Sequence, residues 1–197
     1  MNDLRLHLSS VRDAIDSAYR YHKLLADRAI GQTSDEALRR PLDEHTNSIA
    51  AIMKHVAGNL RSRWAEFLTS DGEKPDRDRD AEFVDDFADR AELIAYWEAG
   101  WKTLLDSLAA LNPEDMGRTV TIRGEAFSVP AALARSLAHT AYHVGQIVQL
   151  ARHWAGEEWE TLTIPRGKSQ KFNQAAWGER TYGAIPADLQ QQRQQQQ

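Results

Sequence analysis

Apolar residues recur every three or four positions through four long segments of this chain, with charged residues between them. Because an α-helix turns once per 3.6 residues, this spacing gives each segment one apolar face and one solvated face. We expect helices over residues 3–28, 48–69, 90–111 and 129–154, the last of them ending at Gly156. Four amphipathic helices bury their apolar faces most economically against one another. The predicted fold is therefore an all-α four-helix bundle.

Two of the connections carry signals of their own. Residues 70–89, between the second and third helices, form a long charged loop, and residues 71–92 hold ten acidic and four basic residues. Two short β-branched or aromatic runs flank residues 123–125, which predicts a small β-hairpin just before the fourth helix. Ser48, or Thr46 or Asn47 before it, can cap the second helix, and Ser128 can cap the fourth.

The chain has the composition of one ordinary globular domain. Its 197 residues are 42% hydrophobic and 27% charged, enough to bury a core unaided. We expect a single domain over residues 1–186, of which residues 157–186 form a C-terminal arm. The Gln-rich residues 187–197 are of low complexity, and we expect them to be disordered.

Charge and hydropathy exclude several classes of partner. The formal net charge is −5, and no basic stripe of the kind that neutralises phosphates is present, so we expect no nucleic-acid binding. No apolar run has membrane-spanning length, and the N-terminal residues lack the pattern of a signal peptide. We therefore expect a cytoplasmic protein that does not bind membranes. Cysteine is absent, which excludes disulfides, thiolate metal sites and a cysteine nucleophile.

The segment SLAHTAYHVGQI places His139 and His143 four residues apart within the fourth predicted helix. Residues at this spacing lie on one helix face, where they can bind one ion or simply share a polar edge. A third histidine, His55, lies beside the apolar stripe of the second helix. Three neutral imidazoles with open coordination positions would form a catalytic type of metal site, although the sequence alone does not show that they converge.

Two better-known histidine motifs do not fit. The zinc-protease motif needs Glu directly after the first histidine, and Thr140 occupies that position. The di-iron bundle motif needs Glu three residues before a histidine, and neither His139 nor His143 is preceded in this way.

The segments HVAGN and HTAYHVGQI, with a hairpin between them, resemble the DinB/YfiT-like superfamily of metal-dependent helical bundles. The segments DGEKPDRDRDAEF and IPRGKSQKFN are similar to a branch of that superfamily whose function is unknown, and the resemblance extends to about Gly178. It implies that His55, His139 and His143 hold a divalent transition metal, namely zinc, nickel or iron. Superfamily members include transferases that use low-molecular-weight thiols and a thiol-dependent isomerase.

The resemblance thus implies an enzyme that activates a water or a low-molecular-weight thiol for transfer to, or hydrolysis of, a small-molecule substrate. Gln146, Asn59, Tyr142 and Arg63 lie near the predicted ligands in sequence. They can orient a ligand, meet a substrate or form a polar helix edge. The sequence indicates no general base.

The alternative hypothesis is a non-catalytic helical bundle that serves as an interaction or stress-related protein. Under either hypothesis we expect a homodimer, the commonest oligomeric state.

Overall fold

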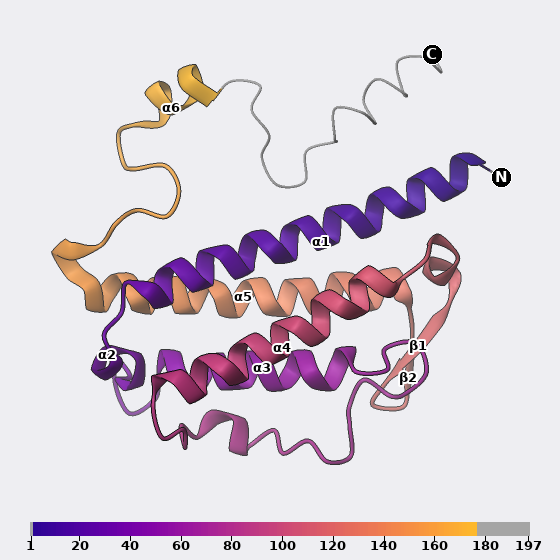
Figure 1. Cartoon of the computed structure of the whole chain (residues 1–197), viewed down its shortest axis with the longest axis horizontal. Coiled ribbons are helices and arrows are strands. Elements are labelled where there is room, and N and C mark those ends of the chain that lie inside the picture. Colours follow the sequence, from indigo (N-terminus) through magenta and orange to yellow (C-terminus); the bar gives the residue numbers. More distant parts are fainter. Residues whose placement is uncertain (1, 177–197) are drawn as a thin grey trace.

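The computed structural model describes the backbone of residues 2–176 and the side chains of residues 11–175. Over this range the chain is mostly helical with one two-stranded hairpin (Figure 1). The Gln-rich tail predicted over residues 187–197, and the end of the predicted arm, lie outside the described residues. In chain order the elements are α1 (Asn2–Gly31), α2 (Asp35–Arg39), α3 (Ile49–Trp64), η1 (Ala81–Phe83), α4 (Arg90–Ala110), η2 (Pro113–Gly117), β1 (Thr119–Ile122), β2 (Glu125–Ser128), α5 (Val129–Ala155), η3 (Gly156–Glu158) and α6 (Ser169–Ala176).

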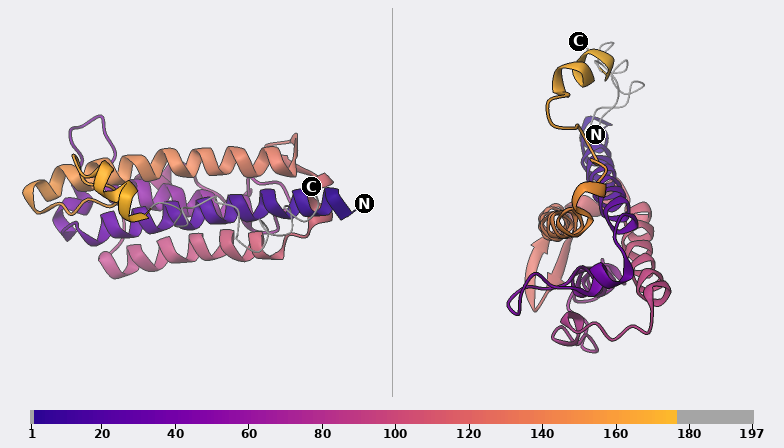
Figure 2. Two further views of the ribbon diagram at one scale, coloured as in Figure 1. Left: turned by 90° about the horizontal axis from the view of Figure 1, so that it is seen from above. Right: turned by 90° about the vertical axis from the view of Figure 1, so that its left-hand side faces the viewer.

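The long helices α1, α3, α4 and α5 lie side by side (Figure 2). Helix α1 packs against α5, α3 packs against α4, and α3 also contacts α5. The side chains of Trp64, Trp97, Trp101 and Tyr19 are fully buried between them. These helices confirm the four helical segments that the apolar periodicity predicts.

The predicted end of the second long helix was wrong. Helix α3 stops at Trp64, because Ala65 is extended and Glu66 has a left-handed φ of 51°. Phe67 continues the apolar spacing in the sequence, but it lies in the loop and stacks on Trp64 with ring centroids 4.7 Å apart. An apolar residue can thus keep a helical spacing while packing on the core from outside the helix.

The other ends of these elements follow the local signals. Ser48 and Ser128 are the N-cap residues of α3 and α5, and each side-chain oxygen accepts a hydrogen bond from a backbone N–H three residues later. Gly156 caps α5 with a φ of 57°. The predicted hairpin is confirmed, and its two-residue turn, Arg123-Gly124, has φ values of 55° and 76°, as a type I′ turn requires.

Helix α3 is buried on all sides from Ile49 to Leu60, although it carries polar residues. The α3–α4 connection (residues 65–89) covers the face that would otherwise meet solvent (Figure 1). Ser62 Oγ donates a hydrogen bond to the carbonyl oxygen of Gly72 at 2.9 Å, and Lys54 Nζ donates to that of Val84 at 2.9 Å. These contacts fix the α3–α4 connection against the helix and place its side chains beside those of α3.

Two short helices were not predicted. Helix α2 is a single turn between α1 and α3, in a segment that reads as a break. Helix α6 forms within the predicted C-terminal arm and projects away from the long helices (Figure 1). Among the described residues, no helix has both the length and the apolar character needed to cross a bilayer.

Candidate metal centre

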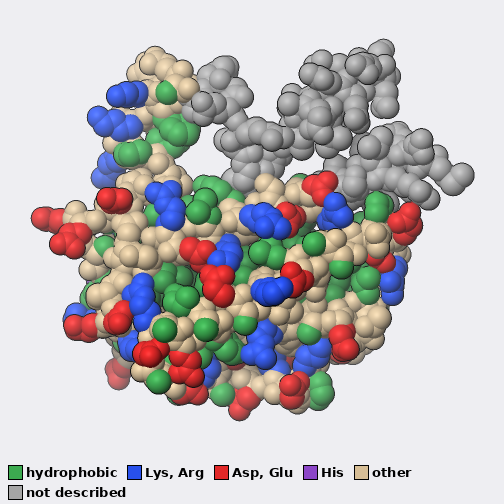
Figure 3. Space-filling model, viewed as in Figure 1, with side chains coloured by type: hydrophobic (Ala, Val, Ile, Leu, Met, Phe, Trp, Pro, Cys, Tyr) green, Lys and Arg blue, Asp and Glu red, His purple; other side chains and the backbone are tan. Residues whose placement is uncertain are grey.

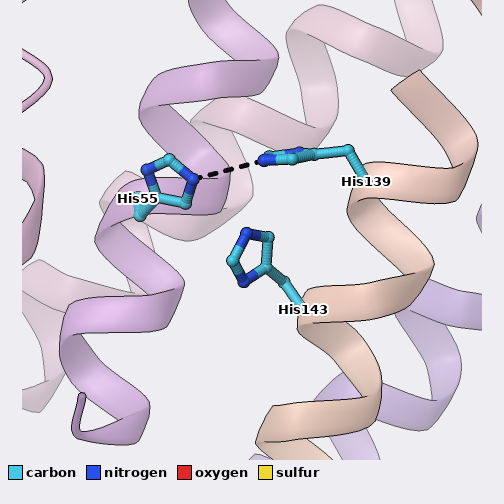
Figure 4. Close-up of side chains that lie close together, drawn as sticks. All are labelled: His55, His139 and His143. Atoms are coloured by element: carbon cyan, nitrogen blue, oxygen red, sulfur yellow. Dashed lines mark hydrogen bonds between the residues drawn. The ribbon is translucent and has the colours of Figure 1, made fainter. Parts of the chain in front are cut away.

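His55 on α3 and His139 and His143 on α5 point toward one another (Figure 4). Each offers one ring nitrogen to a set whose atoms all lie within 4.8 Å of one another. His55 is buried, with 2% of its surface exposed, while His139 and His143 are half-buried. The structure therefore brings together all three residues that the sequence singled out.

Two neighbouring residues of the α3–α4 connection set the orientation of His55. Its Nδ1 lies 2.9 Å from Oε2 of Glu82, and Phe83 stacks on its ring with centroids 4.5 Å apart. An ionised carboxylate only accepts hydrogen bonds, so Nδ1 of His55 carries the proton and donates it. The lone pair is then on Nε2, which faces the other two histidines.

Glu82 is itself held in place from two sides. It is buried, with 4% of its surface exposed, and Arg77 donates to it through Nε and Nη2, both at 2.8 Å. Burial alone would raise the pKa of Glu82, but the hydrogen bonds from His55 and Arg77 hold that pKa below its ordinary value of 4.5. On its third side the carboxylate lies against Gly58 of α3, where a Cβ atom would collide with Oε1.

His143 is oriented from its own helix. Its Nδ1 lies 2.8 Å from Oε1 of Gln146, and Nε2 of Gln146 donates to the hydroxyl of Tyr142 at 3.2 Å. The amide oxygen accepts from Nδ1, so Nε2 of His143 also carries a lone pair. Of the four polar residues considered in the sequence, Gln146 and Tyr142 contact a predicted ligand directly. The Tyr142 ring packs edge-on against that of His143, with centroids 5.0 Å apart.

The surroundings keep two of the imidazoles neutral. Burial, followed by the nearby His143 and His55 rings, lowers the pKa of His139 from 6.5 to about 3. Burial also lowers the pKa of His143. A neutral imidazole has the free lone pair that a metal ligand needs.

The spacing of the histidines fits a transition metal. The Nε2 atoms of His55 and His139 lie 3.3 Å apart. At a tetrahedral zinc with Zn–N bonds of about 2.0–2.1 Å, two ligand nitrogens lie about 3.3 Å apart. The ligand nitrogen of His143 lies within 4.8 Å of those of His55 and His139, so that all three histidines could hold one ion. The carboxylate of Glu82 contacts His55 in the way that carboxylates usually contact histidines at metal sites.

A cavity of about 380 Å³ opens beside His55 and His139. Its wall includes the apolar side chains of Trp64, Phe67 and Ile122. The remaining two polar candidates from the sequence, Asn59 and Arg63, also line it. A small molecule bound in this cavity would lie next to the histidine cluster.

The comparison with protein families gives one match. The family described as "Protein of unknown function (DUF1572)" matches residues 6–168, more than half of the 197-residue chain. The chain belongs to this family. Neither the curated proteins nor the solved structures gave a match. The part that matches the DUF1572 family contains the whole histidine cluster and the α3–α4 connection.

In this DUF1572 domain, sequence reasoning missed Glu82, Phe83 and Arg77. All three lie in the α3–α4 connection, where acidic and basic residues alternate without helical or strand periodicity. Nothing local distinguishes Glu82 from the other carboxylates there. Its role depends on the path of the α3–α4 connection across α3, which brings it to a histidine 27 residues away.

Proposed function

We propose that this protein is a metal-dependent enzyme of the DinB/YfiT-like superfamily, with the four-helix-bundle topology of that superfamily. His55, His139 and His143 would hold a divalent transition metal, namely zinc, nickel or iron. The observation that carries the proposal is the convergence of three ring nitrogens within 4.8 Å of one another at the edge of a cavity. Three protein ligands leave at least one coordination position for a substrate or water.

The residues of the chain have separate tasks in this proposal. Glu82 and Phe83 hold the His55 ring, Gln146 holds the His143 ring, and the cavity beside His139 admits the substrate. The metal would act as a Lewis acid and lower the pKa of a water or thiol that it binds. Since the chain has no cysteine, a thiol nucleophile would come from a second small molecule. The reaction would be a transfer or a hydrolysis, and the homodimer expected from the sequence remains part of the proposal.

The first test is the metal content of the full-length chain, purified without a histidine tag and without chelators. We expect close to one zinc, nickel or iron ion per chain by elemental analysis. The His139→Ala/His143→Ala variant should lose it, because one imidazole cannot hold the ion. His153→Ala is the matched control, because His153 is exposed on the same helix, near its end.

Circular dichroism of each variant separates loss of a ligand from loss of the fold. A wild-type chain that stays metal-free after incubation with zinc, nickel, iron and manganese would overturn the proposal. Equal loss of metal in the His153→Ala control would also argue against the three-histidine site.

A second measurement separates an enzyme from a non-catalytic bundle with a closed site. A bound paramagnetic ion such as Mn²⁺ accelerates the relaxation of water protons only when water exchanges at the ion. We expect this acceleration, because three ligands leave the coordination shell open. A metal that binds tightly but gives no acceleration would favour the interaction protein considered as the alternative.

A further inference from the structure

The cavity beside the histidine cluster is rich in arginine. Of its lining residues five are arginines, and no aspartate or glutamate of the described chain lines it. This contrasts with the chain as a whole, whose net charge is −5, and with the face seen in Figure 3, where acidic and basic side chains are interspersed. The lining arginines are Arg63, Arg77, Arg79, Arg123 and Arg135.

Carboxylates behind the cavity wall neutralise only part of this charge. Glu73 accepts hydrogen bonds from Arg63 at 2.8 Å, from Arg77 at 3.1 Å and from Arg123 at 2.9 Å. Glu82 accepts from Arg77 alone among these arginines. Asp71 also lies close enough to Arg63 to interact with its charge. Three carboxylates therefore balance these three guanidinium groups, and the unbalanced charge of the cavity belongs to the other two arginines.

The other two lining arginines have no carboxylate partner in the described part of the chain. The guanidinium of Arg79 lies 5.6 Å from the ring centroid of Phe83, and that of Arg135 lies 5.2 Å from that of Phe127. A cation over an aromatic face is held in place but keeps its charge and its hydrogen-bond donors. Both groups thus remain able to pair with an anion.

One buried donor also lacks a partner. The Nη1 atom of Arg63 is inaccessible to solvent and makes no hydrogen bond to any described residue. Its Nη2 atom is bonded to Glu73, so the guanidinium cannot turn away without breaking that contact. Buried guanidinium nitrogens are normally paired, so Arg63 keeps one unsatisfied donor in a residue that lines the cavity.

We propose that this cavity binds the acidic group, a carboxylate or a phosphate, of a small substrate whose apolar part packs against Phe67. The inference rests on the proposed function, because it places the reacting end of that substrate at the histidine cluster. Arg135 precedes His139 by one turn of α5, about 6 Å along the helix axis. The acidic group of the substrate therefore lies a few bonds from the atom that reacts. Guanidinium groups suit this task, because their paired donors match the oxygens of both acids.

Three probes of similar size test the charge requirement: phenylphosphonate, benzoate and uncharged benzamide. Each probe is titrated by calorimetry into two forms of the full-length chain. The first form is stripped of metal with a chelator, which is then removed, and the second is loaded with zinc. The metal-free titration measures the cavity alone, because an anion could also bind the metal directly. We expect at least one of the two anions to bind at least about tenfold more tightly than benzamide in both forms, since hydrogen bonds to charged groups are the stronger ones. The stronger anion identifies the acid.

Arg135→Gln and Arg79→Gln remove exposed guanidinium groups without disturbing the buried contacts of Glu73 and Glu82. We expect each substitution to lower the affinity for the preferred anion about tenfold, and to lower the affinity for benzamide much less. The matched control is Arg152→Gln, an exposed arginine about 26 Å further along α5, which should leave anion binding within about twofold.

Equal affinity for the anions and benzamide would overturn the inference. It would also be overturned if Arg152→Gln lost as much anion affinity as Arg135→Gln and Arg79→Gln. The two proposals fail separately. A chain that binds metal but shows no preference for anions keeps the metal centre and refutes the anion site. A chain that binds the anions but never binds metal keeps the anion site and refutes the metal centre.

Discussion

Gly58 lies on α3 three residues after His55, directly beneath the Glu82 carboxylate. A Cβ atom at this position would overlap Oε1 of Glu82 and also approach its Cδ to 2.8 Å. The end of a free glutamate could swing aside, but this one is buried and held by His55 and Arg77. Gly58→Ala should therefore displace Glu82 and leave the Nδ1–H group of His55 without its hydrogen-bond acceptor.

Two opposing effects set the expected change in the free energy of unfolding. Replacing a glycine within a helix by alanine stabilises it by roughly 1 kcal/mol. Losing a single hydrogen bond to a charged group, such as that between His55 and Glu82, costs about 1.5–3 kcal/mol. Gly145→Ala is the matched control, because Gly145 lies within α5, two residues after His143, with nothing near its added Cβ. The free energies of unfolding of the two metal-free variants should thus differ by about 1.5–3 kcal/mol, with Gly58→Ala the less stable.

Urea denaturation of the metal-free proteins measures the difference in the free energy of unfolding, and competition with a chromophoric chelator measures metal affinity. We expect Gly58→Ala to bind zinc about 10–100-fold more weakly than the wild type, as when the group that orients a ligating histidine is removed. Gly145→Ala should bind as the wild type does. If both variants gain stability equally and bind zinc equally, Glu82 does not orient His55, and the reasoning is refuted.

Two further predictions concern the scaffold. Gly100 of α4 allows close contact with α3, because a Cβ there would lie 2.7 Å from Cα of Ala57. Gly100→Ala should therefore lower the free energy of unfolding by about 1–3 kcal/mol, measured by urea denaturation. An unchanged denaturation midpoint would contradict this prediction. Hydrogen bonds from the backbone N–H groups of Glu73 and Gly124 lower the pKa of Asp71 from its ordinary 3.8. A lowered folded-state pKa stabilises the fold above the unfolded value, and this gain is lost as the pH falls through the folded-state value. The stability difference between wild type and Asp71→Asn should therefore shrink below pH 3.8, and a constant difference down to pH 2 would rule out this linkage.

The sequence by itself determined the features that depend on neighbours within a few residues. Apolar spacing predicted the four long helices, Ser48 and Ser128 predicted two caps, and residues 123–125 marked the hairpin turn. Helical spacing also placed His139 and His143 on one face of α5. Each of these features follows from backbone geometry over one or two turns, so local sequence is sufficient to predict it.

Only the tertiary structure decided which distant side chains meet. His55 and His139 are 84 residues apart in the chain, and Glu82 reaches His55 from a connection without periodicity. The arginines of the cavity come from α3, the α3–α4 connection, the hairpin turn and α5. Two of them, Arg77 and Arg79, lie in the sequence among acidic residues that do not line the cavity. Such convergence depends on how helices pack and how a long connection crosses them. Those paths are set by the burial of the whole core, and no short segment of sequence records them.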